Sequence, residues 1–108
     1  MNKELLLVEV IDLAKTINKH LNHKDSIKFY TAIEESLENS DVYKFIKEIM
    51  YTCSRKYIEI PESFGKILTY DKNLHKEIMY TFVLNSKINE GSARERLQAK
   101  RELVQLPN

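Results

Sequence analysis

The sequence predicts an all-α protein, a small antiparallel four-helix bundle with an additional C-terminal helix or tail. Apolar residues recur at steps of three and four over most of the chain, which is the spacing of amphipathic helices. Two glycines and two prolines provide little turn chemistry for a many-stranded sheet. With 108 residues there is room for one domain, which we divide into a helical bundle at 1–90 and a basic C-terminal helix or tail at 91–108.

The first predicted helix covers about residues 3–21, and the polar residues 22–25 end it. Its apolar stripe consists of Leu6, Val10, Leu13, Ile17 and Leu21. Asp25 or Ser26 is then expected to cap a second helix, because a short side-chain oxygen accepts from the unpaired N–H groups of a first turn. The apolar stripe of this second helix consists of Phe29, Ile33 and Leu37.

The third helix follows a second capping cluster at residues 39–41. Its stripe combines Val42, Phe45, Ile46, Ile49, Met50, Cys53 and Tyr57. Cys53 falls in step with this apolar face, so we interpret it as a core residue; a reactive thiol needs an electropositive and partly exposed setting. As the single cysteine it excludes an internal disulfide and fits a reducing cytoplasm.

Two connections in the second half of the chain are less regular. Residues 56–60 alternate like a strand, but no partner strand is evident, so we expect a helix end or an extended linker. Pro61 can stand in the first turn of a short helix, whose apolar face holds Phe64, Ile67 and Leu68. Residues 71–73 are either a corner or a polar turn of a continuing helix, and an apolar helix then runs to about Leu84.

The last segment has a thin apolar stripe and many cations. Gly91 is a natural break, and Ser92 with Glu95 has the spacing of a capping box, so a weakly docked helix is expected after it. Its cations are Arg94, Arg96, Lys100 and Arg101. They could favour an anionic membrane surface, at about 1 kcal/mol per cation, or form a solvated helix face with the interleaved Glu95 and Glu102.

Charge and hydropathy exclude several classes of protein. Seventeen Lys and Arg against sixteen Asp and Glu leave a net charge of +1, which disfavours a dedicated nucleic-acid binder. The longest apolar run, residues 5–8, is far shorter than the roughly 20 residues that cross a bilayer. Glu4, Glu9 and Asp12 interrupt the only candidate for a signal peptide. We therefore expect a cytoplasmic protein, at most peripheral at the inner face of the membrane.

No residue pattern predicts catalysis. His20 and His23 are three positions apart, but two ligands make no zinc site, so we interpret them as surface histidines. Glu34, Glu35 and Glu38 lie opposite the apolar stripe of their helix and are interpreted as a solvated acidic face. There is no phosphate-binding loop or dinucleotide fingerprint. We expect a protein that is not an enzyme and that needs no cofactor, metal or small-molecule substrate.

Six tyrosines and no tryptophan suggest amphipathic residues at the edge of a core or at an interface. The four in the central and later parts of the chain are Tyr51, Tyr57, Tyr70 and Tyr80. We expect most of them to pack at the edge of the core, and one or two to anchor a partner.

Two blocks of the chain resemble the lactococcin A and pediocin-like bacteriocin immunity proteins. They are Ile-Glu-Glu-Ser-Leu-Glu-Asn-Ser-Asp at 33–41 and Tyr-Thr-Phe-Val-Leu-Asn-Ser-Lys at 80–87, and the resemblance extends over residues 29–88. It implies a four-helix bundle that protects its producer by binding the bacteriocin-engaged membrane components of the mannose phosphotransferase permease from the cytoplasmic side, which blocks the pore. It maps partner recognition onto Tyr80, Phe82, Asn85, Ser86 and Lys87, and more loosely onto Arg94, Arg96, Lys100 and Arg101.

A second hypothesis belongs to a different class. Small helical proteins of mixed charge can also act as phage- or plasmid-encoded adaptors that bind a host protein such as RNA polymerase. The acidic face of the second helix, with Glu34, Glu35 and Glu38, would then be the docking surface.

Overall fold

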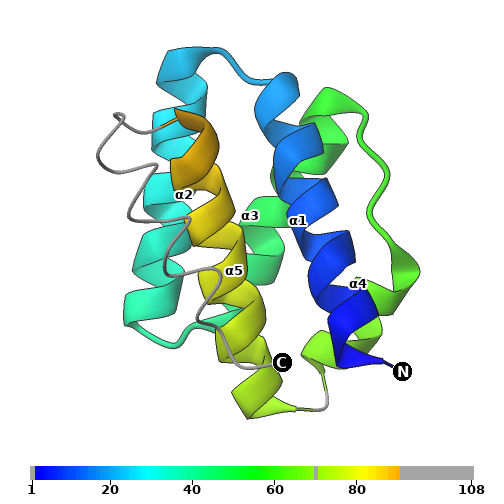
Figure 1. The fold of residues 1–108 in the computed structure, drawn as a ribbon. Helices are drawn as coiled ribbons and strands as arrows, with labels where there is room; N and C mark the ends of the chain where they lie inside the picture. Colours follow the sequence, from blue (N-terminus) through cyan, green and yellow to red (C-terminus); the bar gives the residue numbers. More distant parts are fainter. Residues whose placement is uncertain (1, 70, 91–108) are drawn as a thin grey trace.

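The computed structural model describes residues 2–69 and 71–90, and these residues form a bundle of helices (Figure 1). The helices are α1 (Lys3–Lys19), α2 (His23–Glu38), α3 (Val42–Lys56), α4 (Glu62–Leu68) and α5 (Lys72–Glu90). No strand occurs in the described ranges, and the predicted all-α fold class is confirmed. The expected C-terminal helix or tail at 91–108 lies outside these ranges.

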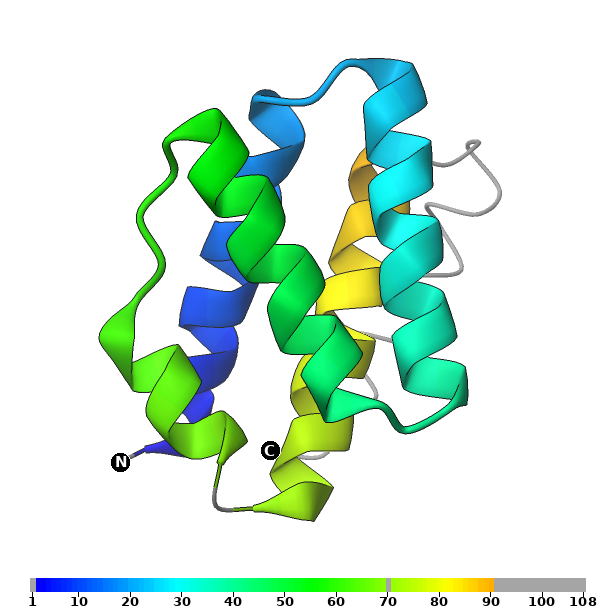
Figure 2. The ribbon, with the colours of Figure 1, turned by 180° about the vertical axis from the view of Figure 1, so that it is seen from behind.

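Helix α5 lies between α1 and α2 and packs against both of them (Figure 1). On the far side α3 packs against α2, and the short α4 packs against α1 and α5. The chain reverses direction from α1 to α2 and again from α2 to α3. Residues 57–61 and α4 then return it to the end where α1 begins, so that α5 runs in the same direction as α1 (Figures 1 and 2).

Phenylalanine rings from four helices join these helices at the centre of the core. The ring of Phe82 on α5 meets Phe29 of α2 edge to face at 5.7 Å between centroids, and Phe45 of α3 at 5.9 Å. Phe45 in turn lies 6.0 Å from the ring of Phe64 on α4. Such aromatic pairs add about 0.5–1.5 kcal/mol to the free energy gained by burying the rings.

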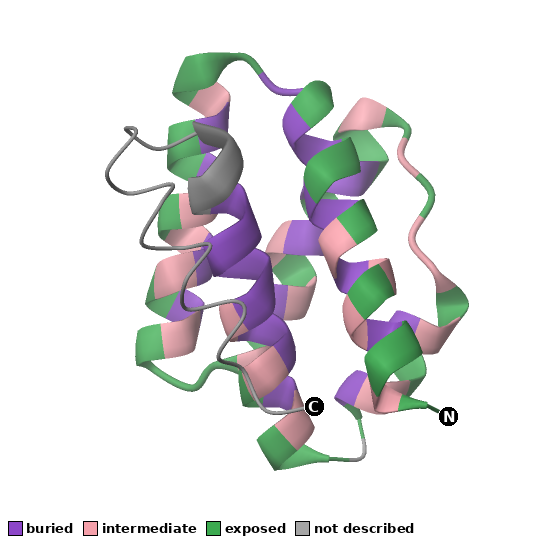
Figure 3. Cartoon of the chain, viewed as in Figure 1, coloured by how far each residue is buried: buried purple, intermediate pink, exposed green. Residues whose placement is uncertain are grey.

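Residues 81–86 of α5 form the longest run of consecutive buried residues in the described chain. Every residue from Thr81 to Ser86 is buried, which Figure 3 shows as a continuous purple stretch. An amphipathic helix normally buries its one apolar stripe and leaves its other face exposed to solvent. Here α1 and α2 cover opposite flanks of α5, so both of its flanks lose contact with water.

Polar side chains in the connections between helices cap the first turns of the helices that follow. Asp41 caps α3 by accepting from the N–H of Lys44 at 2.9 Å, as the cluster at 39–41 predicts. Asp71 accepts from the N–H groups of Asn73 and Leu74 at 3.0 and 3.1 Å, so residues 71–73 form a corner where α5 begins.

The expected cap of the second helix is wrong. Asn22, and not Asp25 or Ser26, caps α2: its Oδ1 accepts from the N–H of Asp25 at 2.8 Å. Ser26 is buried and donates its hydroxyl to Asn18 Oδ1 at 3.3 Å. The polar first turn of α2 contains no apolar residue before Ile27, so hydrophobic spacing alone does not reveal where the helix starts.

Helix α3 ends in the way expected for residues 56–60. Tyr57 adopts a left-handed conformation with φ of 56°, and the following N–H of Ile58 donates to the carbonyl of Cys53 at 2.8 Å. Residues 58–61 then run without helix, and Ile58 and Ile60 pack partly buried against the core. The alternation of this stretch therefore belongs to a linker.

We predict that Phe82→Ala lowers the free energy of unfolding by about 3 kcal/mol, because it removes a fully buried ring that joins three helices. Chemical denaturation followed by circular dichroism measures the change. Tyr43→Ala is the matched control: this side chain is 89% exposed, so its removal should change stability by less than about 0.5 kcal/mol. An unchanged unfolding midpoint for Phe82→Ala would contradict the packing described above.

Candidate functional site

Three of the residues to which the resemblance assigns partner recognition lie inside the bundle. Phe82, Asn85 and Ser86 are all at most 2% exposed, whereas Tyr80 is partly exposed. Lys87 belongs to the last part of α5. A partner could contact the three buried side chains only after this part of α5 is uncovered. The basic residues Arg94, Arg96, Lys100 and Arg101 lie outside the described part of the chain.

The buried half of α5 also carries polar side chains. Among the described residues, Thr81 Oγ1 and Ser86 Oγ have no hydrogen-bond partner, and the amide nitrogen of Asn18 on α1 has none. A buried polar group without a partner costs about 1–3 kcal/mol. These residues therefore weaken the packing of α5 relative to an apolar core.

Helix α3 and the residue that follows it carry most of the large apolar side chains that are exposed in the described ranges. Of seven such side chains in the described ranges, four lie on α3 or directly after it: Tyr43, Met50, Tyr51 and Tyr57. The stripe predicted for this helix is wrong at two positions, because Met50 is 56% and Tyr57 97% exposed. Helix α3 packs mainly against α2 and contacts α4 and α5 through Phe45. These neighbouring helices therefore cover only part of the wide apolar stripe of α3.

Two of these residues, Tyr51 and Tyr57, lie near the end of α3. The guanidinium of Arg55 lies 5.6 Å from the ring centre of Tyr51, within the range of a cation–π interaction. Tyr57 has the left-handed backbone that a bulky residue rarely adopts, and its side chain is almost fully exposed. Strained and exposed residues of this kind are concentrated at functional sites. The expectation that most of the four tyrosines pack at the edge of the core is wrong for Tyr51 and Tyr57, which are exposed, whereas Tyr80 is half-buried. Tyr70 lies outside the described residues.

A groove of about 820 Å³ opens beside the first half of α3. We call it the α3–α5 groove; its lining consists of Ser40, Val42, Tyr43, Ile46, Leu68, Thr69, Lys72, Asn73, His75, Lys76 and Met79. The groove lies where α3 passes the corner between α4 and α5. Figure 2 shows how these three segments are arranged. Nothing in the sequence pattern indicates it, because its walls come from segments about 30 residues apart in the chain.

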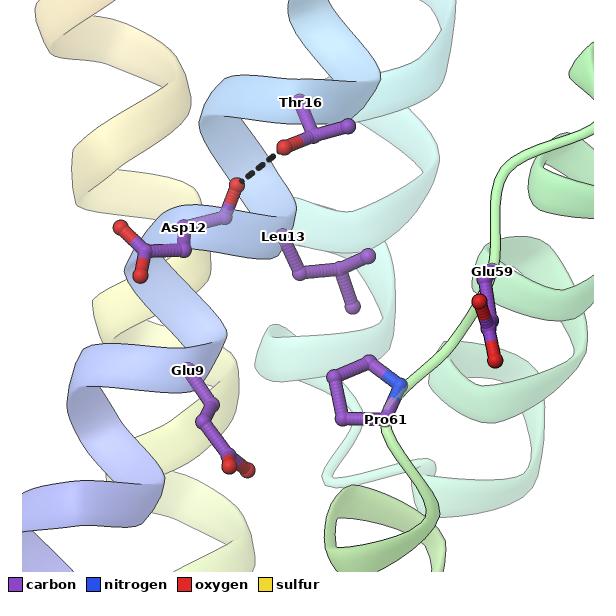
Figure 4. A pocket seen from close by; sticks show the side chains of 6 residues that line it. All are labelled: Glu9, Asp12, Leu13, Thr16, Glu59 and Pro61. Atoms are coloured by element: carbon purple, nitrogen blue, oxygen red, sulfur yellow. Dashed lines mark hydrogen bonds between the residues drawn. The ribbon is translucent and has the colours of Figure 1, made fainter.

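A smaller pocket of about 220 Å³ lies between α1 and the linker after α3 (Figure 4). Glu9, Asp12 and Glu59 line it, but their carboxylates do not converge on one point in Figure 4. Glu9 also accepts a hydrogen bond from the hydroxyl of Ser63, which ties α1 to α4. We therefore assign these acids to the structure of this corner.

The other candidates from the sequence take structural or surface positions. No group of three or more His, Cys, Asp or Glu side chains within residues 2–69 and 71–90 could hold a metal ion. His20 and His23 are both exposed. Of the acidic residues on α2, Glu35 and Glu38 are exposed, Glu34 is half-buried, and Glu35 forms an ion pair with Lys44 of α3 at 2.8 Å. The hydrogen bond from Lys44 to Glu35 raises the pKa of this lysine, against a smaller opposing effect of desolvation.

No described helix has the length and apolar character needed to span a lipid bilayer.

Cys53 is buried at 1% exposure, so its interpretation as a core residue is confirmed. Desolvation raises the pKa of its thiol from 9.0 to about 11. The unfolded chain therefore releases the thiol proton at a lower pH than the folded chain does. We predict that Cys53 makes the free energy of unfolding decrease as the pH rises from 9.0 toward about 11.

Denaturation at a series of pH values compares the native chain with Cys53→Ala, which lacks the titrating group. The difference in free energy of unfolding between the native chain and this variant should decrease from pH 9.0 to about 11. A difference that stays constant over this pH range would show that the thiol has the same pKa in the folded and the unfolded chain.

The chain was also compared with known proteins. No protein-family model, no curated protein and no solved structure matches it significantly. These comparisons therefore assign neither a family nor a function to the chain.

Proposed function

We propose that the protein is a bacteriocin immunity protein. It binds the membrane components of the mannose phosphotransferase permease from the cytoplasmic side, once a bacteriocin has engaged them, and blocks the pore. The observation that carries this proposal is the set of large apolar side chains exposed on and after α3, a surface suited to binding another protein. The resemblance at 33–41 and 80–87 supplies the identity of the partner.

The two resemblance blocks contribute to the scaffold in this proposal. Ile33 of the first block and Phe82 of the second are fully buried, and they lie on α2 and α5, which pack against each other. Core residues of this kind hold the exposed side chains of the bundle in place before a partner arrives. A preorganised surface loses less entropy on binding than a flexible one.

Protection by this route requires binding energy and no chemical step. In this proposal the protein binds the bacteriocin-engaged permease more tightly than the free permease and forms a complex in which the pore is blocked. The fraction of permease in this complex depends on the difference between the two affinities. Exposed aromatic side chains such as Tyr51 and Tyr57 are the residue type that commonly dominates such binding energies.

The second candidate is a non-enzymatic adaptor that binds a host protein such as RNA polymerase. The exposed carboxylates of Glu35 and Glu38 on α2 favour it, since they could meet a basic partner surface. The ion pair between Glu35 and Lys44 offsets part of this acidic character. We therefore rank the adaptor second.

Expression in a sensitive strain that carries the mannose permease tests the first proposal. We expect survival against at least one of a panel of permease-targeting bacteriocins, and reduced survival for the double variant Tyr51→Ala with Tyr57→Ala. The matched control is Leu5→Ala with Val8→Ala, which removes two exposed apolar side chains from α1 and should preserve protection. Lack of protection against every member of a broad panel would favour the adaptor, and isolation of bound cytosolic proteins would follow.

The basic residues of the C-terminal segment provide a separate prediction. Replacing Arg94, Arg96, Lys100 and Arg101 together by Gln should lower protection, because each cation near an anionic membrane surface contributes about 1 kcal/mol. The helical circular dichroism signal and unfolding midpoint should stay as in the native chain. Replacing the exposed Lys15, Lys19, Lys24 and Lys28 of α1 and α2 by Gln removes the same charge as a control. If both variants lose protection equally, the loss depends on the net charge of the protein and not on the C-terminal cations.

A further inference from the structure

We propose that the α3–α5 groove binds an acidic amphipathic helix of a partner protein. Apolar side chains of this helix lie on the floor of the groove, and its carboxylates face Lys72 and Lys76. The inference rests on the groove alone and holds whether or not the partner belongs to a bacteriocin system.

The floor of the groove is apolar and its walls are helices. Val42 and Ile46 of α3 stand on one side, and Leu68 and Met79 line it from α4 and α5. Leu68 and Met79 are each 1% exposed, so they form a packed base, and Tyr43 stands almost fully exposed at the rim. A volume of about 820 Å³ admits several side chains. A third helix laid between two helices is a recurrent mode of protein recognition.

The charged residues that line the groove are both cationic. Lys72 and Lys76 are exposed and lie one helical turn apart on α5, and neither has a carboxylate within ion-pair distance among the described residues. They stand in the first two turns of α5, where the helix dipole favours negative charge. The first turn contains no acidic residue, and Glu77 in the second turn forms an ion pair with Lys3 of α1 at 2.8 Å. Asp71 at the cap uses its carboxylate on the N–H groups of Asn73 and Leu74. This end of the groove therefore favours an anionic ligand.

His75 provides a polar contact inside the groove. Its side chain is 6% exposed and lines the groove between the two lysines. Nε2 lies 3.2 Å from the carbonyl oxygen of Ile67, and Nδ1 has no partner among the described residues. A ring that donates from Nε2 to this carbonyl leaves Nδ1 as an acceptor. Because Nδ1 is shielded from solvent, His75 belongs to the base of the groove, and the charge of the groove comes from the two exposed lysines.

An acidic helix fits these features better than the other candidate occupants. A bilayer surface is flat and would reach the rim lysines without touching Leu68, Met79 or His75. The C-terminal segment of the chain, residues 91–108, carries four cations against two acids, so Lys72 and Lys76 would repel it. Carboxylates at positions i and i+4 of a partner helix match the spacing of the two lysines.

The experiment is a selection from a displayed library of amphipathic helices, in which the solvent-facing positions vary among Glu, Gln and Lys. The target is the full chain, and the counter-target is the variant Lys72→Glu with Lys76→Glu. We expect enrichment of helices with Glu beside apolar positions. The best peptide is then measured by isothermal titration calorimetry, and its binding should weaken about tenfold in the counter-target and with increasing salt.

The matched control is Lys24→Glu with Lys28→Glu, which reverses two exposed lysines at the same spacing in the first turns of α2 and should bind like the native chain. Tyr43→Ala, at an exposed rim position, should also weaken binding and leave stability unchanged. Amide chemical-shift changes on peptide binding should concentrate in residues 42–46 and 68–79. The proposal is wrong if the selection enriches no helix, or only helices without acidic residues. It is also wrong if peptide affinity falls equally in both charge-reversal variants, or if the amide chemical-shift changes lie outside residues 42–46 and 68–79. Lysine-dependent binding of vesicles containing anionic lipid, without binding of any library helix, would also overturn it.

Discussion

The ring of Phe82 holds helix α5 at the centre of the bundle, because it meets Phe29 of α2 and Phe45 of α3 edge to face. Phe45 extends the same set of contacts to Phe64 on the short α4. Four helices therefore converge on a few rings, and each depends on the others for its position. The geometry of aromatic pairs is directional, so these contacts define how the helices cross as well as how firmly they associate.

The central position of α5 decides which residues can meet a partner. Because α1 and α2 cover its flanks, Phe82, Asn85 and Ser86 become internal, although their sequence block resembles a recognition segment. Helix α3, in contrast, packs mainly against α2, and its side chains Tyr43, Met50 and Tyr51 remain exposed to solvent. The same arrangement creates the α3–α5 groove, since α3 reaches α5 through Phe45 and leaves the corner after α4 open.

Function in such a bundle follows from surfaces whose shape the core maintains. Tyr51 beneath Arg55, Tyr57 with its left-handed backbone, and the lysines of the groove all stand at the ends or edges of rigid helices. Binding of a membrane protein complex and binding of an acidic helix are compatible uses, because the exposed side chains near the end of α3 and the groove near its start are separate surfaces that share only Tyr43. The unpartnered hydroxyls of Thr81 and Ser86 reduce the stability gained by burying this segment of α5.

The sequence by itself determined the all-α class and most of the core, whereas it left residues 71–73 open between a corner and a continuing helix. Apolar spacing identifies Leu6, Ile33 and Cys53 as buried, because a helix turns its residues to one side at a known period. The cluster of capping residues at 39–41 likewise predicts the start of α3, since capping is a local hydrogen bond, and the structure shows that Asp41 is the cap. Only the tertiary structure decided that Met50 and Tyr57 are exposed, that α5 is enclosed, and that a groove lies between α3 and α5. The physical reason is that periodicity tells which side of a helix is apolar, whereas burial depends on how much of this side a neighbouring helix covers.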